Sequence, residues 1–151
     1  MGRVDKENYY LNIAEAVLER STCIRRKYGA VIVKNDEIVS TGYNGAARGC
    51  GNCVDMNECL REKLGVPPGE RYELCRSVHA EANAIIAAPR EQMLGATMYL
   101  VCHDRNGLAP AESCRMCRRL MINAGIQRVI NRTSPGKYSV IPVRDWVAEE
   151  R

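Results

Sequence analysis

The segment HAEANAIIAA, residues 79–88, places a histidine and a glutamate at the start of a strongly helix-forming run. Pro89 follows and ends the predicted helix, because proline has no backbone N–H and clashes with the preceding turn. A second segment, CRMC at residues 114–117, opens another predicted helix that runs to Ala124. Two predicted helices therefore begin with side chains that bind metals: His79 in the first, and Cys114 and Cys117 in the second.

The segments around these helices predict a mixed sheet. Strands are expected where β-branched residues run together, and a tight turn at Asn35-Asp36 joins the first two strands as an antiparallel hairpin. Alternating helices and strands after a hairpin are typical of one α/β domain, covering residues 1–151, with helices on the faces of the sheet. The expected strands are 30–34, 38–43, 97–102 and 126–131, the further helices are 6–19 and 144–149, and Lys137 and Tyr138 are expected in a surface loop.

Composition places the chain among ordinary globular proteins, with 46% hydrophobic and 26% charged residues. No apolar run approaches the length of a membrane span, and the first residues lack the apolar segment of a signal peptide, so a cytoplasmic location is expected. A net charge of +4 suits an anionic small molecule such as a nucleotide but is too small to require nucleic acid. Eight cysteines in a chain without a signal peptide indicate metal binding or catalysis rather than disulfides.

The histidine and the two cysteines match the needs of a catalytic zinc site. Two cysteines three positions apart at a helix start can face one ion, and the helix dipole favours their thiolates. With His79 as the third ligand, one tetrahedral position stays open for water, as in catalytic zinc sites. Glu81 lies about 200° round the helix from His79, which makes it a proton shuttle rather than a ligand. Taken alone, His79 could be a packed core histidine, and the Cys-x-x-Cys motif could be a redox or structural pair.

In combination, the two motifs resemble the zinc signature of nucleobase deaminases, H-x-E…P-C-x-x-C. The chain is similar to the cytidine and deoxycytidylate deaminase superfamily over nearly its whole length, and most of all to the deoxycytidylate (dCMP) deaminases. The similarity includes residues 25–33, 40–45 and 117–126, which read RRKYGAVIV, STGYNG and CRRLMINAGI. It implies a cytidine-deaminase-like fold of three layers, with a mixed five-stranded sheet between helices on both faces. It also implies a homo-oligomer, often a hexamer.

The resemblance further implies an activity, the hydrolysis of the exocyclic amine of dCMP to give dUMP and ammonia. Glu81 is implied to be the general acid and base of this reaction. Asn44 is implied to hydrogen-bond the sugar, and the N–H of Ala80 to meet the pyrimidine carbonyl. The implied ligands of the catalytic zinc are His79, Cys114 and Cys117.

Ser113 and a basic segment before the first strand bear on the same site. The family usually has proline where this chain has Ser113, and a serine there is expected to cap the helix that starts at Cys114. Arg25, Arg26 and Lys27 lie in the region that the resemblance places near the substrate phosphate, and arginine suits bidentate phosphate binding. Arg26 is the expected phosphate contact, while a solvated turn or a subunit contact is the alternative for each of the three.

Further cysteines, in or near the irregular region that precedes His79, predict a second, structural zinc. The region is polar and rich in glycine, so it has little apolar surface with which to order itself, and a metal would supply the missing stabilisation. Cys50 is an alternative ligand to Cys23, because Cys50 forms a Cys-x-x-Cys motif with Cys53, whereas the resemblance favours Cys23. Reduced thiols in a loop are the remaining alternative. The predicted ligands form a closed Cys₄ site of Cys23, Cys53, Cys59 and Cys75.

Two other functions fit parts of the pattern. A superfamily relative that acts on cytosine, guanine or adenosine in transfer RNA would share the zinc motif, although a transfer-RNA enzyme needs a stronger basic face than +4 provides. A non-catalytic zinc protein that binds nucleotides or DNA would share the ligands. Glu81 argues against this second alternative, because a structural zinc site has no use for an unliganded carboxylate.

Overall fold

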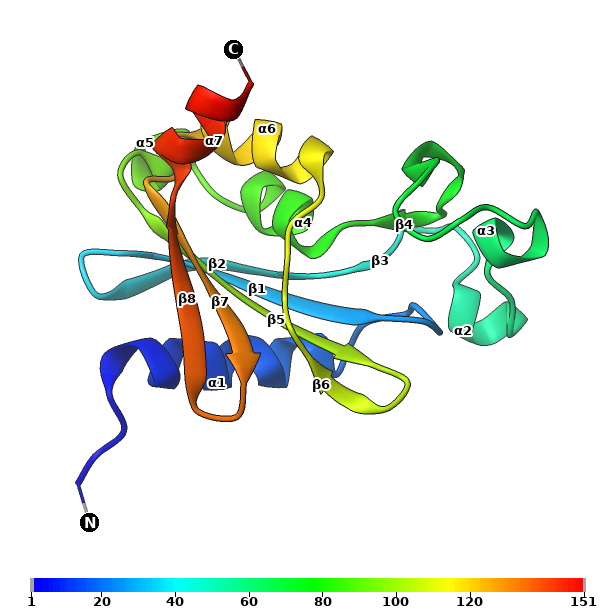
Figure 1. Ribbon diagram of the computed structural model, residues 1–151, viewed down its shortest axis with the longest axis horizontal. Coiled ribbons are helices and arrows are strands. Elements are labelled where there is room, and N and C mark those ends of the chain that lie inside the picture. Colours follow the sequence, from blue (N-terminus) through cyan, green and yellow to red (C-terminus); the bar gives the residue numbers. More distant parts are fainter. Residues whose placement is uncertain (1, 151) are drawn as a thin grey trace.

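The computed structural model describes residues 2–150 and is built round one central sheet (Figure 1). Its strands are β1 (Lys27–Lys34), β2 (Glu37–Tyr43), β5 (Thr97–Asp104), β6 (Gly107–Ala109), β7 (Arg128–Ser134) and β8 (Lys137–Pro142). Five of them follow one another in the order β2-β1-β5-β7-β8, and the short β6 pairs with β5. β5 and β7 run parallel, whereas the other neighbours run antiparallel. The predicted mixed five-stranded sheet is therefore confirmed, with β6 as a short addition.

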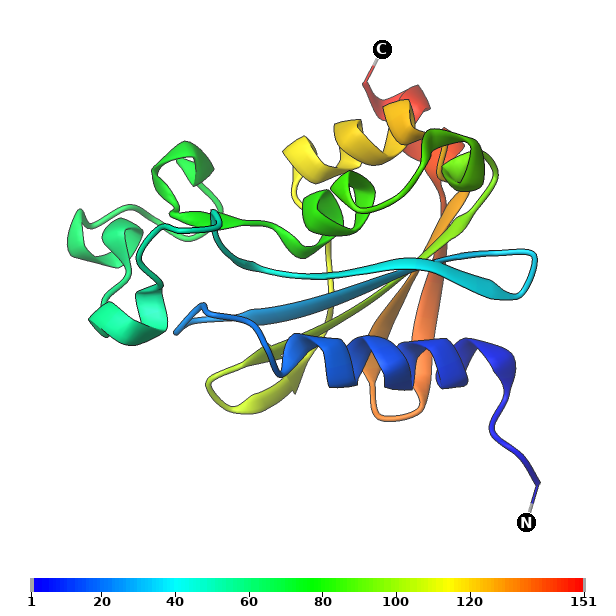
Figure 2. The same ribbon diagram turned by 180° about the vertical axis from the view of Figure 1, so that it is seen from behind.

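Helices cover both faces of the sheet, as predicted. α1 (Lys6–Leu18) lies on one face, while α4 (Ala80–Ile86), α5 (Arg90–Met93), α6 (Arg115–Ala124) and α7 (Val143–Glu149) lie on the other (Figure 1 and Figure 2). Gly125 ends α6 in the left-handed conformation, with a φ of 85°, which glycine adopts without strain. Among residues 2–150, no helix has the length and apolarity needed to cross a membrane.

Two apolar layers stabilise this arrangement, one on each face of the sheet. Along β1, Ala30 and Ile32 belong to the layer under α4 and α6, whereas Val31 and Val33 belong to the layer under α1. This alternation follows from the strand period of two residues. The central strands are buried on both faces, and for this reason they appear in the sequence as continuous apolar runs.

One strand differs from prediction, because Lys137 and Tyr138 begin β8 instead of forming a surface loop. A turn with Gly136 at a φ of 72° reverses the chain, and β8 then pairs antiparallel with β7. β8 lies at the edge of the sheet, and its residues are only exposed or half-buried. The apolar alternation that reveals a strand in a sequence is therefore weak there.

The chain leaves the sheet between β3 (Gly45–Ala46) and β4 (Ser77–Val78), and residues 47–76 form what we call the excursion. β3 and β4 pair with each other, so the excursion begins and ends at the same place. It contains only short helical turns, α2 (Cys53–Met56), α3 (Leu60–Lys63) and η1 (Tyr72–Leu74). In both views it extends beyond one end of the sheet, opposite to the turn between β1 and β2 (Figure 1 and Figure 2).

A close approach between β2 and α4 positions the first metal-binding motif. A Cβ atom on Gly42 would lie 2.4 Å from Ala80 O and 2.4 Å from Ala84 N, which is too short for any real contact. Only glycine therefore lets the backbone of α4 rest on β2 at this point. The start of α4, with His79 and Glu81, is held directly against the sheet as a result.

Candidate functional site

Two helix starts bring the three predicted metal ligands together. His79 is the N-cap residue of α4 and Cys114 that of α6, both with an extended backbone, while Cys117 lies in the first turn of α6. His79 Nδ1 lies 3.5 Å from Cys114 Sγ and 3.4 Å from Cys117 Sγ. Within the described part of the chain, this is the only set of three His, Cys, Asp or Glu side chains whose donor atoms all lie within 4.8 Å of one another.

These distances fit a tetrahedral zinc ion. Zn–S bonds of about 2.3 Å and a Zn–N bond of about 2.0–2.1 Å, at the tetrahedral angle, place sulfur and nitrogen about 3.5 Å apart. Both observed N···S distances agree with this separation. Thiolate and imidazole are also ligand types that zinc prefers, and three protein ligands leave a fourth position for water. The residues present therefore fit a catalytic rather than a structural zinc.

The electrostatics of the ligand cluster favour a cation. A hydrogen bond from the Cys117 thiol, together with the contact to His79, lowers the pKa of Cys114 to about 4. The Cys114 sulfur in turn is the main cause that raises the pKa of His79 to about 10. Thiolate character at Cys114 favours a cation at this point, and metal binding at such a site releases protons.

Glu81 lies beside the ligands without joining them. The residue is only 3% exposed, and burial raises the pKa of its carboxyl above the usual range. A carboxyl with a raised pKa holds a proton more readily than an exposed one, which suits a group that must act as a general acid as well as a base. Ala80 next to it is fully buried, and the contact of its N–H with a pyrimidine stays a prediction.

A cleft of about 810 Å³ opens beside the metal ligands. Its volume lies within the range of small-molecule sites. The segment that leads into β1, the residue after β2, the excursion and the starts of α4 and α6 all contribute to it. Arg61 and Tyr72 were not predicted to do so, because the short helical turns of the excursion carry no periodic signal that would place them, and Tyr28 was not singled out within its strand. Besides His79 and Cys114, the lining includes Arg26, Tyr28, Asn44, Arg61, Tyr72 and Glu81.

Asn44 borders the cleft and is held by three hydrogen bonds. Its Oδ1 accepts from Ser21 Oγ at 2.6 Å and from Tyr28 N at 2.8 Å, and its Nδ2 donates to Arg26 O at 2.8 Å. Because a primary amide has two N–H donors and two acceptor positions, one donor stays free. Asn44 can therefore donate one hydrogen bond to a ligand in the cleft but accept none.

The structure separates the three basic residues that precede and begin β1. Arg25 borders the cleft but pairs with Glu62, with its Nε 3.6 Å from Glu62 Oε2. Arg26 also borders the cleft, and its interaction is with the neutral Tyr28 side chain, which raises the pKa of Arg26. Lys27 is exposed and does not belong to the lining. Arg26 thus has the charge that is best placed for an anionic ligand.

Ser113 does not cap α6, so that prediction is wrong. The chain is still extended at Cys114, which becomes the N-cap residue itself, and α6 has no side-chain cap. The Ser113 hydroxyl is buried near the Glu81 carboxyl and has no partner at normal hydrogen-bond geometry. The helix begins one residue later than the predicted cap requires because the backbone at Cys114 is still extended, and in this position its sulfur lies 3.5 Å from His79 Nδ1.

The excursion brings the remaining predicted cysteines near one another. Burial raises the pKa of Cys53, and the charges of Cys23, Cys75 and Cys59 raise it further, so all three lie within electrostatic range of Cys53. Backbone N–H groups two residues on point at two of the sulfurs, from Arg25 N to Cys23 Sγ and from Ser77 N to Cys75 Sγ, both at 3.4 Å. Their donor atoms do not reach the close grouping of the His79 set.

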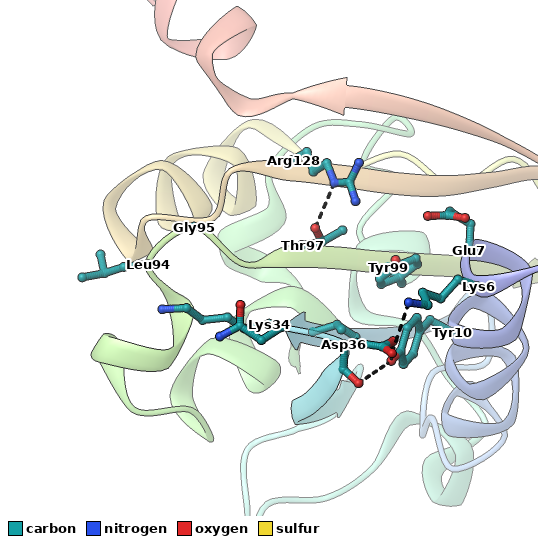
Figure 3. Close-up of a pocket in the computed structure, with 12 residues that line it drawn as sticks. Lys6, Glu7, Tyr10, Lys34, Asp36, Leu94, Gly95, Thr97, Tyr99 and Arg128 are labelled. Carbon is teal, nitrogen blue, oxygen red and sulfur yellow. Dashed lines mark hydrogen bonds and ion pairs between the residues drawn. The ribbon is translucent and has the colours of Figure 1, made fainter.

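A second cavity, of about 270 Å³, lies at the opposite end of the sheet beside the turn between β1 and β2 (Figure 3). Several of its polar and charged groups already have partners. Asp36 accepts from Tyr10 Oη at 2.6 Å and pairs with Lys6 at 3.1 Å, and Arg128 Nε donates to Thr97 Oγ1 at 3.0 Å. None of the predicted site residues lines it, so it is separate from the metal centre.

Comparison with known proteins agrees with the geometry. A family model described as the cytidine and deoxycytidylate deaminase zinc-binding region matches residues 4–133. The deoxycytidylate deaminase of Mycobacterium phage D29 is 39% identical over 135 residues, which cover 86% of this chain and 96% of that protein. The deoxycytidylate deaminase of Schizosaccharomyces pombe is 32% identical over 85% of this chain, but the matched part spans only 37% of the yeast protein.

Solved structures of similar fold include two deaminases. The dCMP deaminase of cyanophage S-TIM5, in complex with dCMP and dUMP, is 26% identical over 85% of this chain and 82% of that chain, with a TM-score of 0.59. The cytidine deaminase of Burkholderia pseudomallei is 20% identical, covers 91% of this chain and 93% of that chain, and has a TM-score of 0.60. The second likeness shows the shared fold alone.

Proposed function

The chain belongs to the cytidine and deoxycytidylate deaminase family, and we propose that it hydrolyses dCMP to dUMP and ammonia. Membership makes it a zinc-dependent hydrolytic deaminase, and the N···S distances of 3.5 and 3.4 Å at the metal centre are the observation on which the activity rests. The names of the similar proteins support dCMP as the substrate, and a structural relative carries dCMP and dUMP. An arginine without a carboxylate partner in the cleft suits a substrate with a phosphate.

The roles of the residues in this reaction follow from their positions. His79, Cys114 and Cys117 would hold the zinc ion, which would lower the pKa of a bound water to about 7 and so supply a nucleophile at neutral pH. Glu81 takes up a proton at its carboxylate as water adds to C4 of the cytosine ring, and delivers it to N3. It then transfers the second proton of the water to the exocyclic nitrogen, which leaves as ammonia. Burial keeps Glu81 from exchanging these protons with bulk solvent.

Two further residues of the cleft, Asn44 and Arg26, are proposed to bind the substrate. The free N–H of the Asn44 amide is available to the sugar, since the other polar positions of that side chain are occupied. Arg26 is the proposed phosphate contact, because its guanidinium borders the cleft without a carboxylate partner. The family resemblance implies the sugar contact of Asn44, and it places the segment of Arg26 near the phosphate.

An ammonia-release assay over dCMP, deoxycytidine, cytosine and guanine tests the substrate. We expect dCMP to be deaminated at least about tenfold faster than deoxycytidine at low concentration, because a charge-assisted hydrogen bond contributes roughly 1.5–3 kcal/mol. Arg26→Ala should remove most of this preference while leaving the slower deoxycytidine reaction unchanged. Lys27→Ala, the exposed neighbour outside the cleft, is the matched control and should behave as wild type. Equal rates on nucleoside and nucleotide would exclude phosphate recognition, and a preference for guanine or cytosine would exclude dCMP.

We also propose that Cys23, Cys53, Cys59 and Cys75 hold a second, structural zinc. Three of these cysteines lie within electrostatic range of the fourth, and two accept backbone N–H bonds of the kind that stabilise thiolates. Cys50, the alternative ligand, is exposed. The excursion has only short helical turns of its own, so a metal at its base would supply stabilisation that the apolar core does not.

Finally, we propose that the protein forms a homo-oligomer, a hexamer in line with the family resemblance. The outer surface of α4 and α6 exposes large apolar side chains, with Ile86 76%, Met116 46% and Leu120 45% exposed. Apolar residues gathered on two neighbouring helices are typical of an interface. Light scattering should give a mass that is a multiple of the 16.9 kDa chain, and Leu120→Glu should lower it. Val54→Glu, an equally exposed position on α2, should leave the mass unchanged. A wild-type monomer would contradict the proposal.

A further inference from the structure

Tyr72 borders the cleft beside the metal ligand His79. Its ring lies edge-on to the His79 ring, with the two centroids 5.4 Å apart and the planes at 88°. Arg26, the proposed phosphate contact, lines the same cleft. A nucleotide that fills the cleft from the metal ligands to Arg26 can therefore contact the Tyr72 ring.

Arg61 holds Tyr72 in this place. The centre of its guanidinium lies 4.4 Å from the centroid of the Tyr72 ring, within the range of a cation–π interaction. Behind the ring, Arg61 donates from Nε and Nη2 to Glu70 O at 3.1 and 2.8 Å, and from Nη2 to Pro67 O at 3.3 Å. One buried side chain thus fixes both the turn before Tyr72 and the ring.

The partners of Arg61 are unusual for a buried charge. The residue is 5% exposed, and its partners among the described residues are backbone carbonyls and the Tyr72 ring rather than a carboxylate. Burying a guanidinium is costly unless its donors are matched. The carbonyls that accept from Arg61 belong to Pro67 and Glu70, in the segment that leads to Tyr72, so this arrangement serves to make that segment rigid.

We propose that Tyr72 is a substrate-binding residue whose ring forms a wall of the nucleotide site, and that Arg61 is the positioning residue that holds it. The inference rests on the proposed function, because it takes the ligand to be a nucleotide with a planar base. Aromatic side chains contribute to nucleotide binding through contact with the base. A ring whose position is already fixed in the free protein loses little conformational freedom when the nucleotide binds.

Replacing the ring tests the role of Tyr72. Tyr72→Ala should raise KM for dCMP about ten- to a hundredfold, the loss expected for one base–aromatic contact, while kcat and zinc content stay close to wild type. Tyr72→Phe keeps the ring and should restore the KM to within about threefold of wild type. Arg71→Ala is the matched control, because Arg71 belongs to the same segment but pairs with Glu73 on the surface. An unchanged KM in Tyr72→Ala, or a loss of zinc, would overturn the assignment.

A double-mutant cycle tests whether Arg61 acts through Tyr72. Arg61→Met keeps the apolar stem and should raise KM, whereas adding it to Tyr72→Ala should change KM by less than about twofold. If the Arg61→Met variant does not fold, the same double-mutant cycle is measured with Arg61→Lys. If the two substitutions raise KM independently of each other, the positioning role of Arg61 is overturned. It is overturned as well if Arg61→Met raises KM for dCMP but not for deoxycytidine, because Arg61 would then be a phosphate contact.

The affinity for dUMP, measured by calorimetry, provides a readout without turnover and should fall in Tyr72→Ala by the same factor as KM rises. If the wild-type protein neither deaminates dCMP nor binds dUMP, the proposed function fails. The Tyr72 comparison is then made with the substrate that the assay panel identifies. A variant that binds this substrate as tightly as wild type overturns the Tyr72 proposal separately.

Discussion

Replacing Glu81 by alanine is expected to lower kcat at least about a thousandfold while the catalytic zinc stays bound. General acid–base groups contribute roughly 10²- to 10⁴-fold, and here one carboxyl handles both proton transfers of the reaction. Zinc should remain because Glu81 does not belong to the group of three donor atoms that fit the ion. The measurements are the rate of ammonia release and the zinc content of the purified variant, read together.

Two further variants separate the role of Glu81 in proton transfer from other effects of its substitution. Glu81→Gln keeps the volume of the buried side chain and should be as inactive as Glu81→Ala, which separates proton transfer from packing. Glu112→Gln removes another acid that borders the cleft, but this side chain is 78% exposed and pairs with Arg118, so its activity should stay within about threefold of wild type. Near-normal turnover in Glu81→Gln, or loss of zinc from either Glu81 variant, would show that Glu81 is not the proton shuttle.

Replacing Cys53 by serine is expected to remove one of two zinc ions and to lower the free energy of unfolding by roughly 3–4 kcal/mol. This is the linkage expected for a metal present at about 100 to 1,000 times its dissociation constant. Cys53 is the best choice among the four cysteines because it does not border the cleft, whereas Cys75 interacts with His79 and would disturb the catalytic centre as well. Urea unfolding and metal analysis give the two quantities.

The control for this variant is Cys50→Ser. Cys50 is exposed, belongs to the same excursion, and should keep both zinc ions and the wild-type unfolding midpoint. Loss of a zinc from Cys50→Ser together with its retention in a Cys23→Ser variant would identify Cys50 as the fourth ligand. One zinc per chain in fully loaded wild-type protein would end the proposal of a structural site and leave the catalytic centre unaffected.

The sequence by itself determined the elements that local chemistry specifies. The helix starts at His79 and Cys114 could be recognised because proline and glycine end the two helices and good helix formers fill them. The ligand types could be recognised from the residues themselves, whereas the helical offset of Glu81 from His79 did not hold, because His79 is the extended N-cap residue of α4. The hairpin of β1 and β2 could be predicted because two segments with β-branched residues flank a short polar turn.

Tertiary structure alone decided the features that depend on distant segments meeting. The sequence shows that His79 and Cys114 could share a metal, but only the packing of α4 beside α6 brings Nδ1 within 3.5 Å of the sulfur. The loss of the expected Ser113 cap likewise follows from the position that Cys114 takes at that centre. Tyr72 and Arg61 have no signal in the sequence, because they lie in irregular chain whose path is set by contacts rather than by periodicity. Sequence patterns reflect interactions within one segment, whereas the cleft forms only where several segments pack together.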